Sequence, residues 1–376
     1  MSEWKETTLG FVLGDKGYIR GPFGSALKRG EMKECGIPVY EQKNAIHNSR
    51  EFRFFIDNNK FNEMKRFQVQ TNDLIISCSG TVGKISIISE SDPKGIISQA
   101  LLILRPDISK IDLMYLYYFL SSKQGFELIT QASHGSVQIN IAERKVVQNI
   151  PILLPPLPEQ HAIASVLSSL DDKIDLLHRQ NKTLEAMAET LFRQWFVEEA
   201  DEGWEEVTLG DFFPVLTGKK DANFGTDDGL YPFFTCSQNP IKAPEYSFDG
   251  SAILLAGNGD FNIKRYVGKF EAYQRTYVLI PSDVTYFGFL YTLMKYYLNE
   301  ITDGHQGSVI NFITKGMITG FSFNLPRDRA SIANKLFRFN QIFEKVDSNT
   351  NQIHTLEKLR DTLLPKLMSG EVRVEI

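Results

Sequence analysis

The feature that most constrains this chain is a tandem repeat. The segment WKETTLG at residues 4–10 recurs as WEEVTLG at residues 204–210. Further pairs follow in the same order: IPVY (37–40) with YPFF (231–234), LIISCSG (74–80) with ILLAGNG (253–259), SQALLILRP (98–106) with YQRTYVLIP (273–281), GSVQIN (135–140) with GSVIN (307–311), and IPILLP (150–155) with FSFNLP (321–326). Chance does not keep so many landmarks in order. The 376 residues therefore predict two copies of one domain.

Each copy mixes strand and helix patterns. Short β-branched runs bounded by Gly, Pro or Ser, such as DLIISCSG, GKISIIS and ALLILRP, predict strands. The aromatic runs KIDLMYLYYFLSSKQGFELI and FGFLYTLMKYYLNEI have helical spacing and predict one or two buried helices in each copy. We interpret these aromatic residues as domain core in preference to stacking platforms for nucleic acid. The expected fold class is α+β, with two similar mixed α/β globular domains.

A heptad pattern follows each copy and predicts two long helices. Pro158 suits a first helical position, and Glu159 lies in the first turn, where the helix dipole favours negative charge. Gly370 is typical of a C-cap, and Pro365 should kink or end the second helix one turn earlier. Steps of three and four residues give a/d spacing, with one asparagine in each series. The first series is Leu167, Leu170, Ile174, Leu177, Asn181, Leu184, Ala188, Leu191 and Trp195, and the second is Phe339, Ile342, Val346, Asn349, Ile353, Leu356, Arg360, Leu363 and Leu367.

The two helices should pair with each other. Each is expected to run about 40 residues, or ~60 Å, and cannot bury its apolar seam alone. The first helix leaves the first domain and the second starts from the second domain, so we expect an antiparallel, pseudo-two-fold coiled coil that separates the domains. A contact between Asn181 and Asn349 should fix its register. The alternative is that each asparagine bonds independently to backbone or water. The expected segments are 1–155 (first domain), 156–198 (central helix), 199–327 (second domain) and 328–376 (C-terminal helix).

Composition and charge narrow the class of protein. With 42% hydrophobic and 23% charged residues, the chain is typical of a globular protein. The start MSEWKETTLGFVLG does not resemble a secretion signal, no window approaches 18 apolar residues, and the three cysteines are far apart, so we expect a cytoplasmic protein. The net charge of −5 divides into +3 for residues 1–155, −6 for 156–202, −3 for 203–327 and +1 for 328–376. This distribution disfavours a non-specific DNA-coating protein, and the acidic middle suggests a solvated or protein-binding segment.

Motifs for catalysis are weak throughout the chain. GNGDFN at 257–262 holds a lone GxG, no GxxxxGK[ST] occurs, and neither LPPL nor NPI matches the loop of a DNA amino-methyltransferase. The six histidines do not occur at metal-ligand spacing, and the Gly-Ser-Val segments lack a GxSxG elbow. We therefore expect no catalytic residue, cofactor site or metal site in this chain.

Polar and basic turns at corresponding positions of both copies are candidates for DNA contact. Arg and Lys suit phosphate or guanine, whereas Asn and Gln suit adenine. In the first copy the candidates are Arg20, Lys28, Lys43, Asn44, Ser79, Thr81, Lys84, His134, Ser136, Gln138, Asn140, Arg144 and Lys145. In the second copy they are Lys219, Lys220, Ser237, Gln238, Asn239, Asn258, Asn262, Lys264, Arg265, Arg275, His305, Gln306, Ser308 and Asn311. Any single one of these residues is more often an ordinary surface residue than a DNA contact. The hypothesis rests on their occurrence at corresponding positions of both copies.

Six segments of the chain form a recognisable set: RGPFGSALK, SGTVGK, GSVQIN, IPILLPPLPEQHAIASVLSSLDDKIDLL, LEAMAETLFRQWF and LEKLRDTLLPKLMSGEVRV. Together they resemble the specificity (S) subunit of type I restriction–modification enzymes, and the resemblance covers essentially the whole chain. It implies a prokaryotic, non-catalytic subunit whose two target-recognition domains each read one half of an interrupted DNA site. It also implies that the helices act as a spacer and dock two methyltransferase (modification) subunits. Methylation and cleavage, with S-adenosylmethionine, ATP and Mg, would belong to the methyltransferase and to the restriction (translocase/nuclease) subunits.

Two other functions remain open from sequence. The chain could be a non-enzymatic scaffold whose acidic helices and end domains bind proteins or peptides. It could also be a self-contained methyltransferase or nuclease, which S-adenosylmethionine binding to the isolated chain would support. Recovery of a bipartite DNA sequence by the chain with its methyltransferase partner separates the DNA-recognition hypothesis from the scaffold.

Overall fold

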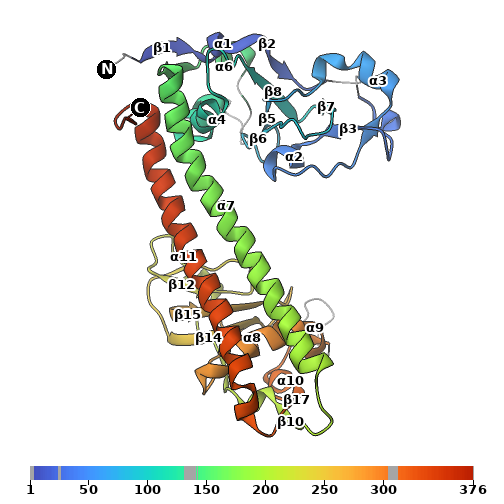
Figure 1. Cartoon of the computed structure of the whole chain (residues 1–376), viewed down its shortest axis with the longest axis vertical. Helices are drawn as coiled ribbons and strands as arrows, with labels where there is room; N and C mark the ends of the chain where they lie inside the picture. Colours follow the sequence, from blue (N-terminus) through green and yellow to red (C-terminus); the bar gives the residue numbers. More distant parts are fainter. Residues whose placement is uncertain (1–3, 24–26, 131–140, 142, 304–311, 376) are drawn as a thin grey trace. The chain divides into compact units, whose positions relative to one another are not determined.

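The computed structural model describes residues 4–23, 27–130, 141, 143–303 and 312–375. The chain divides into two compact units, Met1–Ile174 with His354–Ile376, and Asp175–Ile353. Each unit combines one mixed helix-and-sheet domain with part of two long helices, α7 (Leu157–Arg193) and α11 (Ala333–Ser369), as Figure 1 shows. The predicted fold class, two similar α/β domains and a pair of long helices, is confirmed.

The first domain is built on a four-stranded antiparallel sheet, in the order β2-β8-β5-β6. A three-stranded sheet, β4-β3-β7, lies beside it, and β1 pairs with β9 to join the start and end of the domain. The strands are β1 (Lys5–Thr8), β2 (Leu13–Arg20), β3 (Ile37–Tyr40), β4 (Phe55–Ile56), β5 (Leu74–Ser77), β6 (Ile85–Ile87), β7 (Ile96–Ile97), β8 (Leu101–Pro106) and β9 (Pro151–Leu154). The short helices are α1 (Leu9–Val12), α2 (Gln42–Ile46), α3 (Asn58–Glu63), α4 (Leu113–Ser121), α5 (Lys123–Ile129) and α6 (Arg144–Gln148).

The second domain repeats this topology in one six-stranded sheet, β11-β16-β14-β15-β12-β13. Here the long strand β15 pairs with β14, as β6 pairs with β5, and also with β12, as β7 pairs with β3. Strand β10 pairs with β17 as β1 pairs with β9. The strands are β10 (Glu205–Thr208), β11 (Val215–Thr217), β12 (Tyr231–Phe234), β13 (Ile241–Ala243), β14 (Phe248–Ala256), β15 (Ile263–Ala272), β16 (Thr276–Leu279) and β17 (Ser322–Leu325). The helices are α8 (Phe287–Tyr296), α9 (Leu298–Thr302) and α10 (Lys315–Thr319).

Equivalent strands pair identically in the two domains. The parallel pairing of β3 with β7 joins Val39 to Ile96, and the parallel pairing of β12 with β15 joins Phe233 to Glu271. The paired sequence segments IPVY and YPFF coincide with β3 and β12 themselves. The predicted duplication is therefore a duplication of topology and register as well as of sequence.

The central strands are apolar because both faces of the sheet are buried. In β5, Leu74 and Ile76 belong to the core beneath α4, whereas Ile75 belongs to a second core on the opposite face. In β14, Ile253 and Leu255 face the larger core of the second domain, whereas Leu254 faces a smaller one. Strand side chains alternate between faces, so burial on both sides requires a continuous apolar run. The aromatic segments form α4 with α5 and α8 with α9 and cover the larger cores, as predicted.

Within each unit the two long helices pack in antiparallel fashion. In the first unit, Asp171 of α7 pairs with Arg360 of α11 at 2.8 Å. In the second unit, Nδ2 of Asn349 donates to Oδ1 of Asn181 at 2.9 Å, and the rings of Trp195 and Phe339 are in contact. The expected contact between the two asparagines is therefore present, although Nδ2 of Asn181 also reaches α11, on Thr350. Their role in fixing the register stays a prediction.

The second long helix ends later than the proline rule predicts. Pro365 lies inside α11, which continues to Ser369, so of the two expected effects the ending of the helix is wrong, and a kink at Pro365 stays a prediction. Leu367 and Met368, beyond the proline, are buried in the core of the first unit. Their packing outweighs the backbone hydrogen bond that a proline cannot donate. Gly370 has a φ of +75°, as a C-cap glycine should.

A buried ion pair ties the C-terminal segment to the start of α7 in the first unit. Nε and Nη2 of Arg373 donate to the two carboxylate oxygens of Glu159 at 2.7 and 2.6 Å, and the Glu159 side chain is only 3% exposed. The Arg373 guanidinium also lies 5.7 Å from the centre of the Trp4 ring. Hydrogen bonds from Arg373 lower the pKa of Glu159, outweighing its burial.

This ion pair predicts an acid-sensitive contribution to stability. Because the pKa of Glu159 is lowered in the folded state, the contribution is present above the ordinary glutamate pKa and is lost as the pH falls through the lowered value. Arg373→Ala should therefore lower the urea midpoint of unfolding at pH 7, and the two proteins should converge in acid. Circular dichroism across a pH series measures this. Lys123→Ala, which removes an exposed cation of the same unit, is the control. A deficit that does not change with pH would contradict the assignment.

Candidate nucleic-acid interface

Four connections meet at one end of the second domain. They follow β11 and β12 and link β14 to β15 and β15 to β16. Backbone hydrogen bonds hold them together: Gly218 N to Thr276 O (3.2 Å), Tyr273 N to Phe234 O (2.9 Å), and Gly257 N to Arg275 O (2.8 Å). The four connections are called the loop cluster below. Residues far apart in sequence thus form one polar surface.

The first domain builds the same loop cluster from equivalent bonds. Gly21 N donates to Leu101 O (2.9 Å), Ser98 N to Tyr40 O (2.9 Å), and Cys78 N to Ala100 O (2.8 Å). Each bond has its counterpart in the second domain, offset as the repeated sequence segments predict. At the tips of the equivalent β5–β6 and β14–β15 turns, Gly80 and Gly259 both have positive φ, at 61° and 75°. A left-handed residue at that position favours glycine in both copies.

One side-chain contact between two loops also recurs in both clusters. In the first domain the side-chain amide of Gln42, at the start of α2, makes two hydrogen bonds to Ser79. Its Nε2 donates to the backbone oxygen of Ser79, and its Oε1 accepts from the Ser79 hydroxyl. In the second domain the equivalent residue is Cys236, whose thiol donates to Oδ1 of Asn258 at 2.9 Å. The connection after β3 or β12 is thereby joined to the turn that follows β5 or β14.

The loop cluster of the second domain surrounds a cavity of about 390 Å³. Its lining includes the polar side chains of Asn258, Gln274 and Arg275, with Tyr277 and Phe312 contributing aromatic surface. The Tyr277 hydroxyl donates to the carbonyl oxygen of Ile313 at 2.8 Å. A concave surface with an arginine and two amides can offer donors and acceptors to a base edge or a phosphate.

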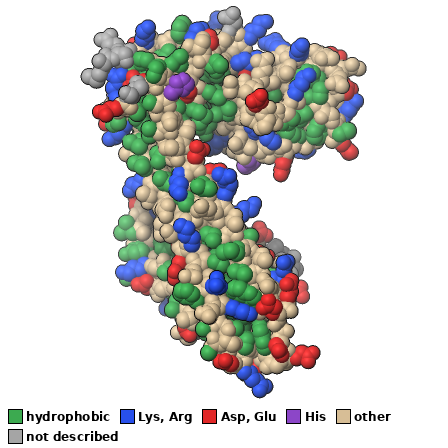
Figure 2. Space-filling model, in the orientation of Figure 1, with side chains coloured by type: hydrophobic (Ala, Val, Ile, Leu, Met, Phe, Trp, Pro, Cys, Tyr) green, Lys and Arg blue, Asp and Glu red, His purple; other side chains and the backbone are tan. Residues whose placement is uncertain are grey.

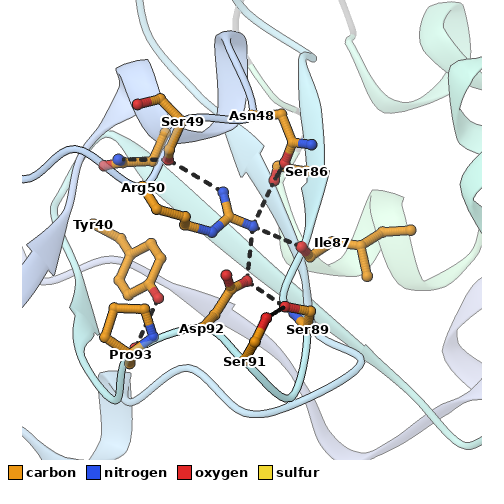
Figure 3. A network of polar contacts seen from close by, with 11 residues as sticks. Tyr40, Asn48, Ser49, Arg50, Ser86, Ile87, Ser89, Ser91, Asp92 and Pro93 are labelled. Carbon is orange, nitrogen blue, oxygen red and sulfur yellow. Dashed lines mark hydrogen bonds and ion pairs between the residues drawn. The ribbon is translucent and has the colours of Figure 1, made fainter. Parts of the chain in front are cut away.

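An arginine network supports the loop that follows α2 in the first domain (Figure 3). Nη2 of Arg50 donates to Ile87 O at 2.8 Å and to the Asp92 carboxylate at 2.8 Å, and it also reaches Ser86 Oγ at 3.2 Å. Ser86 in turn donates to Oδ1 of Asn48. Burial disfavours the charge of Asp92, but hydrogen bonds from Arg50 and the Ser89 backbone outweigh it and lower its pKa. The network fixes the loop between α2 and β4 against β6.

Many of the candidate DNA-contact residues lie on exposed turns and helix surfaces. In the first domain these are Lys28, Ser79, Thr81, Lys84, Arg144 and Lys145, with Arg20 and Lys43 partly exposed. In the second domain they are Lys219, Ser237, Gln238, Asn239 and Arg275, with Lys220 and Asn258 partly exposed. The guanidinium of Arg144 lies 5.8 Å from the centre of the Tyr18 ring, so α6 lies near β2.

Four candidates have internal roles instead. Asn44 is fully buried and forms a capping box with the backbone N–H of Glu41, while its Nδ2 donates to two backbone carbonyls. Asn262 is buried, with Nδ2 bound to Cys236 O and Asp260 O. Lys264 donates to Thr235 O, and its burial lowers its pKa. Arg265 forms a bidentate ion pair with Asp347 of α11 at 2.7 Å. These side chains make contacts within the first or second unit of the chain, and their contact with DNA stays a prediction.

Eight other candidates belong to the two Gly-Ser-Val segments and cannot be placed. His134, Ser136, Gln138 and Asn140 in the first copy lie outside the described residues. So do His305, Gln306, Ser308 and Asn311 in the second copy. Their contact with DNA stays a prediction.

Two residues of the loop clusters were not among the sequence candidates. Gln99 and Gln274 are exposed at equivalent turns that precede β8 and β16. The signal was present in the aligned pair SQALLILRP and YQRTYVLIP, which share that glutamine. Arg50 was also missed, because a single arginine in a polar loop does not differ in sequence from ordinary surface.

Charge is mixed over the molecular surface. Figure 2 shows Lys and Arg side chains interspersed with Asp and Glu over the face in view. Among the described residues, no group of three or more His, Cys, Asp or Glu side chains could hold a metal ion. The helices of the described ranges are also too short or too polar to cross a bilayer. The described residues thus form two equivalent polar loop clusters on duplicated domains, together with a pair of long helices.

Comparison with known proteins identifies the family. Residues 24–186 and 201–358 each match the type I restriction modification DNA specificity domain. The two matches cover most of the chain, which therefore belongs to the family of type I restriction–modification DNA specificity proteins and carries its domain twice.

Individual relatives differ in how much of the chain they match. The EcoDI specificity subunit of Escherichia coli is 42% identical over 175 residues, which are 46% of this chain and 39% of that protein. The chain thus spans well under half of that relative's length. The putative MjaX specificity subunit of Methanocaldococcus jannaschii is 26% identical over 85% of this chain and 83% of its own. The crystal structure of the type I S subunit from M. genitalium has the same fold, with a TM-score of 0.62, 19% identity and coverage of 97% and 96%.

Proposed function

We propose that this chain is the DNA-recognition subunit of a type I restriction–modification complex, in which each domain reads one half of a bipartite, interrupted DNA sequence. The observation that carries the proposal is the loop cluster, which occurs twice with equivalent backbone bonds but different exposed side chains. Equivalent scaffolds present two surfaces of the same shape, and different side chains allow those surfaces to recognise different bases.

The exposed residues divide into those suited to phosphate contacts, which position the protein on DNA, and those suited to base contacts, which recognise its sequence. Lys84, Arg144 and Lys145 in the first domain and Lys219 in the second suit phosphate, which orients a protein on the duplex without selecting its sequence. The amides of Gln238, Asn239 and Asn258 and the guanidinium of Arg275 suit base edges. Because the net charge of the chain is −5, non-specific attraction to DNA is weak, and recognition depends on these local groups.

The long helices serve as a spacer and as the docking site for two methyltransferase subunits. Their support is the paired seam, in which the heptad positions are buried or partly buried, together with the net charge of −6 over residues 156–202. Methylation with S-adenosylmethionine and cleavage with ATP and Mg are assigned to the methyltransferase and restriction subunits. This chain acts as a non-catalytic, cytoplasmic component.

Selection from random duplexes tests the proposal. The full chain, assembled with its methyltransferase partner, should recover a bipartite sequence whose two specific halves are separated by a non-specific spacer of fixed length. Its affinity for that sequence should fall steeply with salt, because phosphate contacts release counterions. Duplexes that are bound without a common bipartite sequence would contradict the proposal and favour a protein-binding scaffold.

A further inference from the structure

The two loop clusters share one exposed residue type at one equivalent position. Gln99 precedes β8 and Gln274 precedes β16, and each occupies the second position of the turn between its neighbouring strands. The residues beside them differ: Ser98 corresponds to Tyr273 and Ala100 to Arg275. The glutamine is retained between two copies whose loops have otherwise diverged.

Three backbone bonds hold each glutamine turn in place. The residue before the glutamine donates to the end of β3 or β12, at 2.9 Å in both domains. The residue after it accepts from the β5–β6 or β14–β15 turn, at 2.8 Å in both domains. The next residue accepts from Gly21 (2.9 Å) or Gly218 (3.2 Å). Each turn is thus tied to three other connections, and a side chain on it is presented from a defined position.

Packing does not account for the shared glutamine. Gly21 and Gly218 are explained by space, because a Cβ there would lie 2.0 Å from the carbonyl oxygens of Ser98 and Ala272. Gln99 and Gln274, in contrast, are exposed, and the backbone bonds of their turns do not depend on the identity of the side chain. Gln274 has one internal side-chain partner, Asp221, but burial requires a glutamine at neither turn. A contact outside the chain therefore accounts for the glutamine that both turns share.

The amide of Gln274 lies at the cavity and keeps hydrogen-bonding capacity beyond its bond to Asp221. Its Nε2 donates one hydrogen to Oδ1 of Asp221 at 2.7 Å, and the side chain lines the cavity beside Asn258 and Arg275. An amide nitrogen carries two hydrogens. One N–H and the carbonyl oxygen therefore remain, and they match the N7 acceptor and the N6 donor of adenine in the major groove.

We propose that Gln99 and Gln274 are equivalent specificity residues, each of which reads the adenine of an A·T pair, one in each half of the recognised DNA sequence. The inference rests on the proposed function and deepens it. It requires that the two half-sites, although different elsewhere, share an A·T pair at the positions that face the two glutamine turns.

Single-substitution variants test the proposal in the assembled complex. The bipartite sequence is first selected from random duplexes with the unaltered protein. Competition binding then compares that duplex with duplexes in which single base pairs are exchanged. Gln99→Ala should abolish a preference of about 5- to 150-fold for one A·T pair in one half-site, and Gln274→Ala should do the same in the other half-site. Each variant should leave the opposite half-site unchanged.

Matched controls separate reading from folding. Gln70→Ala removes an exposed glutamine near the opposite end of β5, and Gln352→Ala removes one from α11, and both should keep every preference. Four results would overturn the inference while leaving the proposed function intact. The two test variants could keep every base preference, or both could lose a preference in the same half-site. The lost preference could be for a G·C pair, or the affinity could fall equally for all duplexes. Failure of the unaltered complex to select a bipartite sequence would overturn the proposed function and this inference with it.

Discussion

Gly218→Ala should lower the free energy of unfolding of the second domain by about 3 kcal/mol or more and abolish recognition of one half-site. A Cβ on Gly218 would lie 2.0 Å from the carbonyl oxygen of Ala272 and 2.4 Å from that of Tyr273. Both obstacles are backbone atoms, so relief requires the β15–β16 turn to move away from the end of β11. That movement breaks the bond from Gly218 N to Thr276 O.

Thermal unfolding and half-site competition binding measure the two consequences. Gly316→Ala is the control in the same domain, because its added methyl group would meet only Thr314 Oγ1, at 3.9 Å. Gly21→Ala, whose Cβ would lie 2.0 Å from Ser98 O, should have the same effect on the first domain and on the other half-site. A Gly218→Ala protein with unchanged stability and half-site preference would show that the loop cluster tolerates displacement.

Arg105→Leu should lower the free energy of unfolding of the first domain by about 3–5 kcal/mol. Asp73 is completely buried, and Nε and Nη2 of Arg105 donate to its two oxygens at 2.7 and 2.8 Å. Burial raises the pKa of Asp73 even beside Arg105. Removing the arginine leaves a buried carboxylate without its cation, and the protein must then unfold locally or protonate the group.

The pH dependence of this loss identifies its cause. Loss of Arg105 raises the pKa of Asp73 further, so the deficit should be largest at neutral pH and should shrink as the pH falls and the carboxyl group takes up a proton. Urea unfolding at several pH values measures it. Arg66→Leu, which removes an exposed arginine of the same domain, should change stability by about 0.5 kcal/mol or less. A deficit for Arg105→Leu that is the same at all pH values would point to lost packing instead of an unpaired charge.

Sequence reasoning succeeded where a pattern is repeated along the chain. The duplication, the apolar central strands and the heptad seams are periodic or recurrent signals, and the structure places them as expected. The contact between Asn181 and Asn349 followed from heptad spacing together with the connectivity of the two domains. Pro365 does not end α11, because the burial of later residues is a tertiary effect that local propensity does not contain.

The composition of the candidate interface was harder to predict. Arg50 and Arg105 look like surface charges in the sequence, yet their carboxylate partners lie 42 and 32 residues away. Asn44 and Arg265 were grouped with the DNA contacts because residue type alone does not reveal burial or an internal partner. The two-residue strands β4 and β7 carry too little sequence to show their pairing. In each case the missing information is a contact between distant segments.

The way the loop clusters are held together also bears on how the chain can evolve. Three of their recurring connections are bonds between backbone amides and carbonyls, with glycine required where two backbones approach, and a fourth joins two loops through side chains. The backbone bonds do not depend on which side chains the turns carry. Exposed residues such as Gln238 or Arg275 can therefore be exchanged without refolding the domain. Under the proposed function, each half of the chain could then acquire a new DNA preference independently of the other.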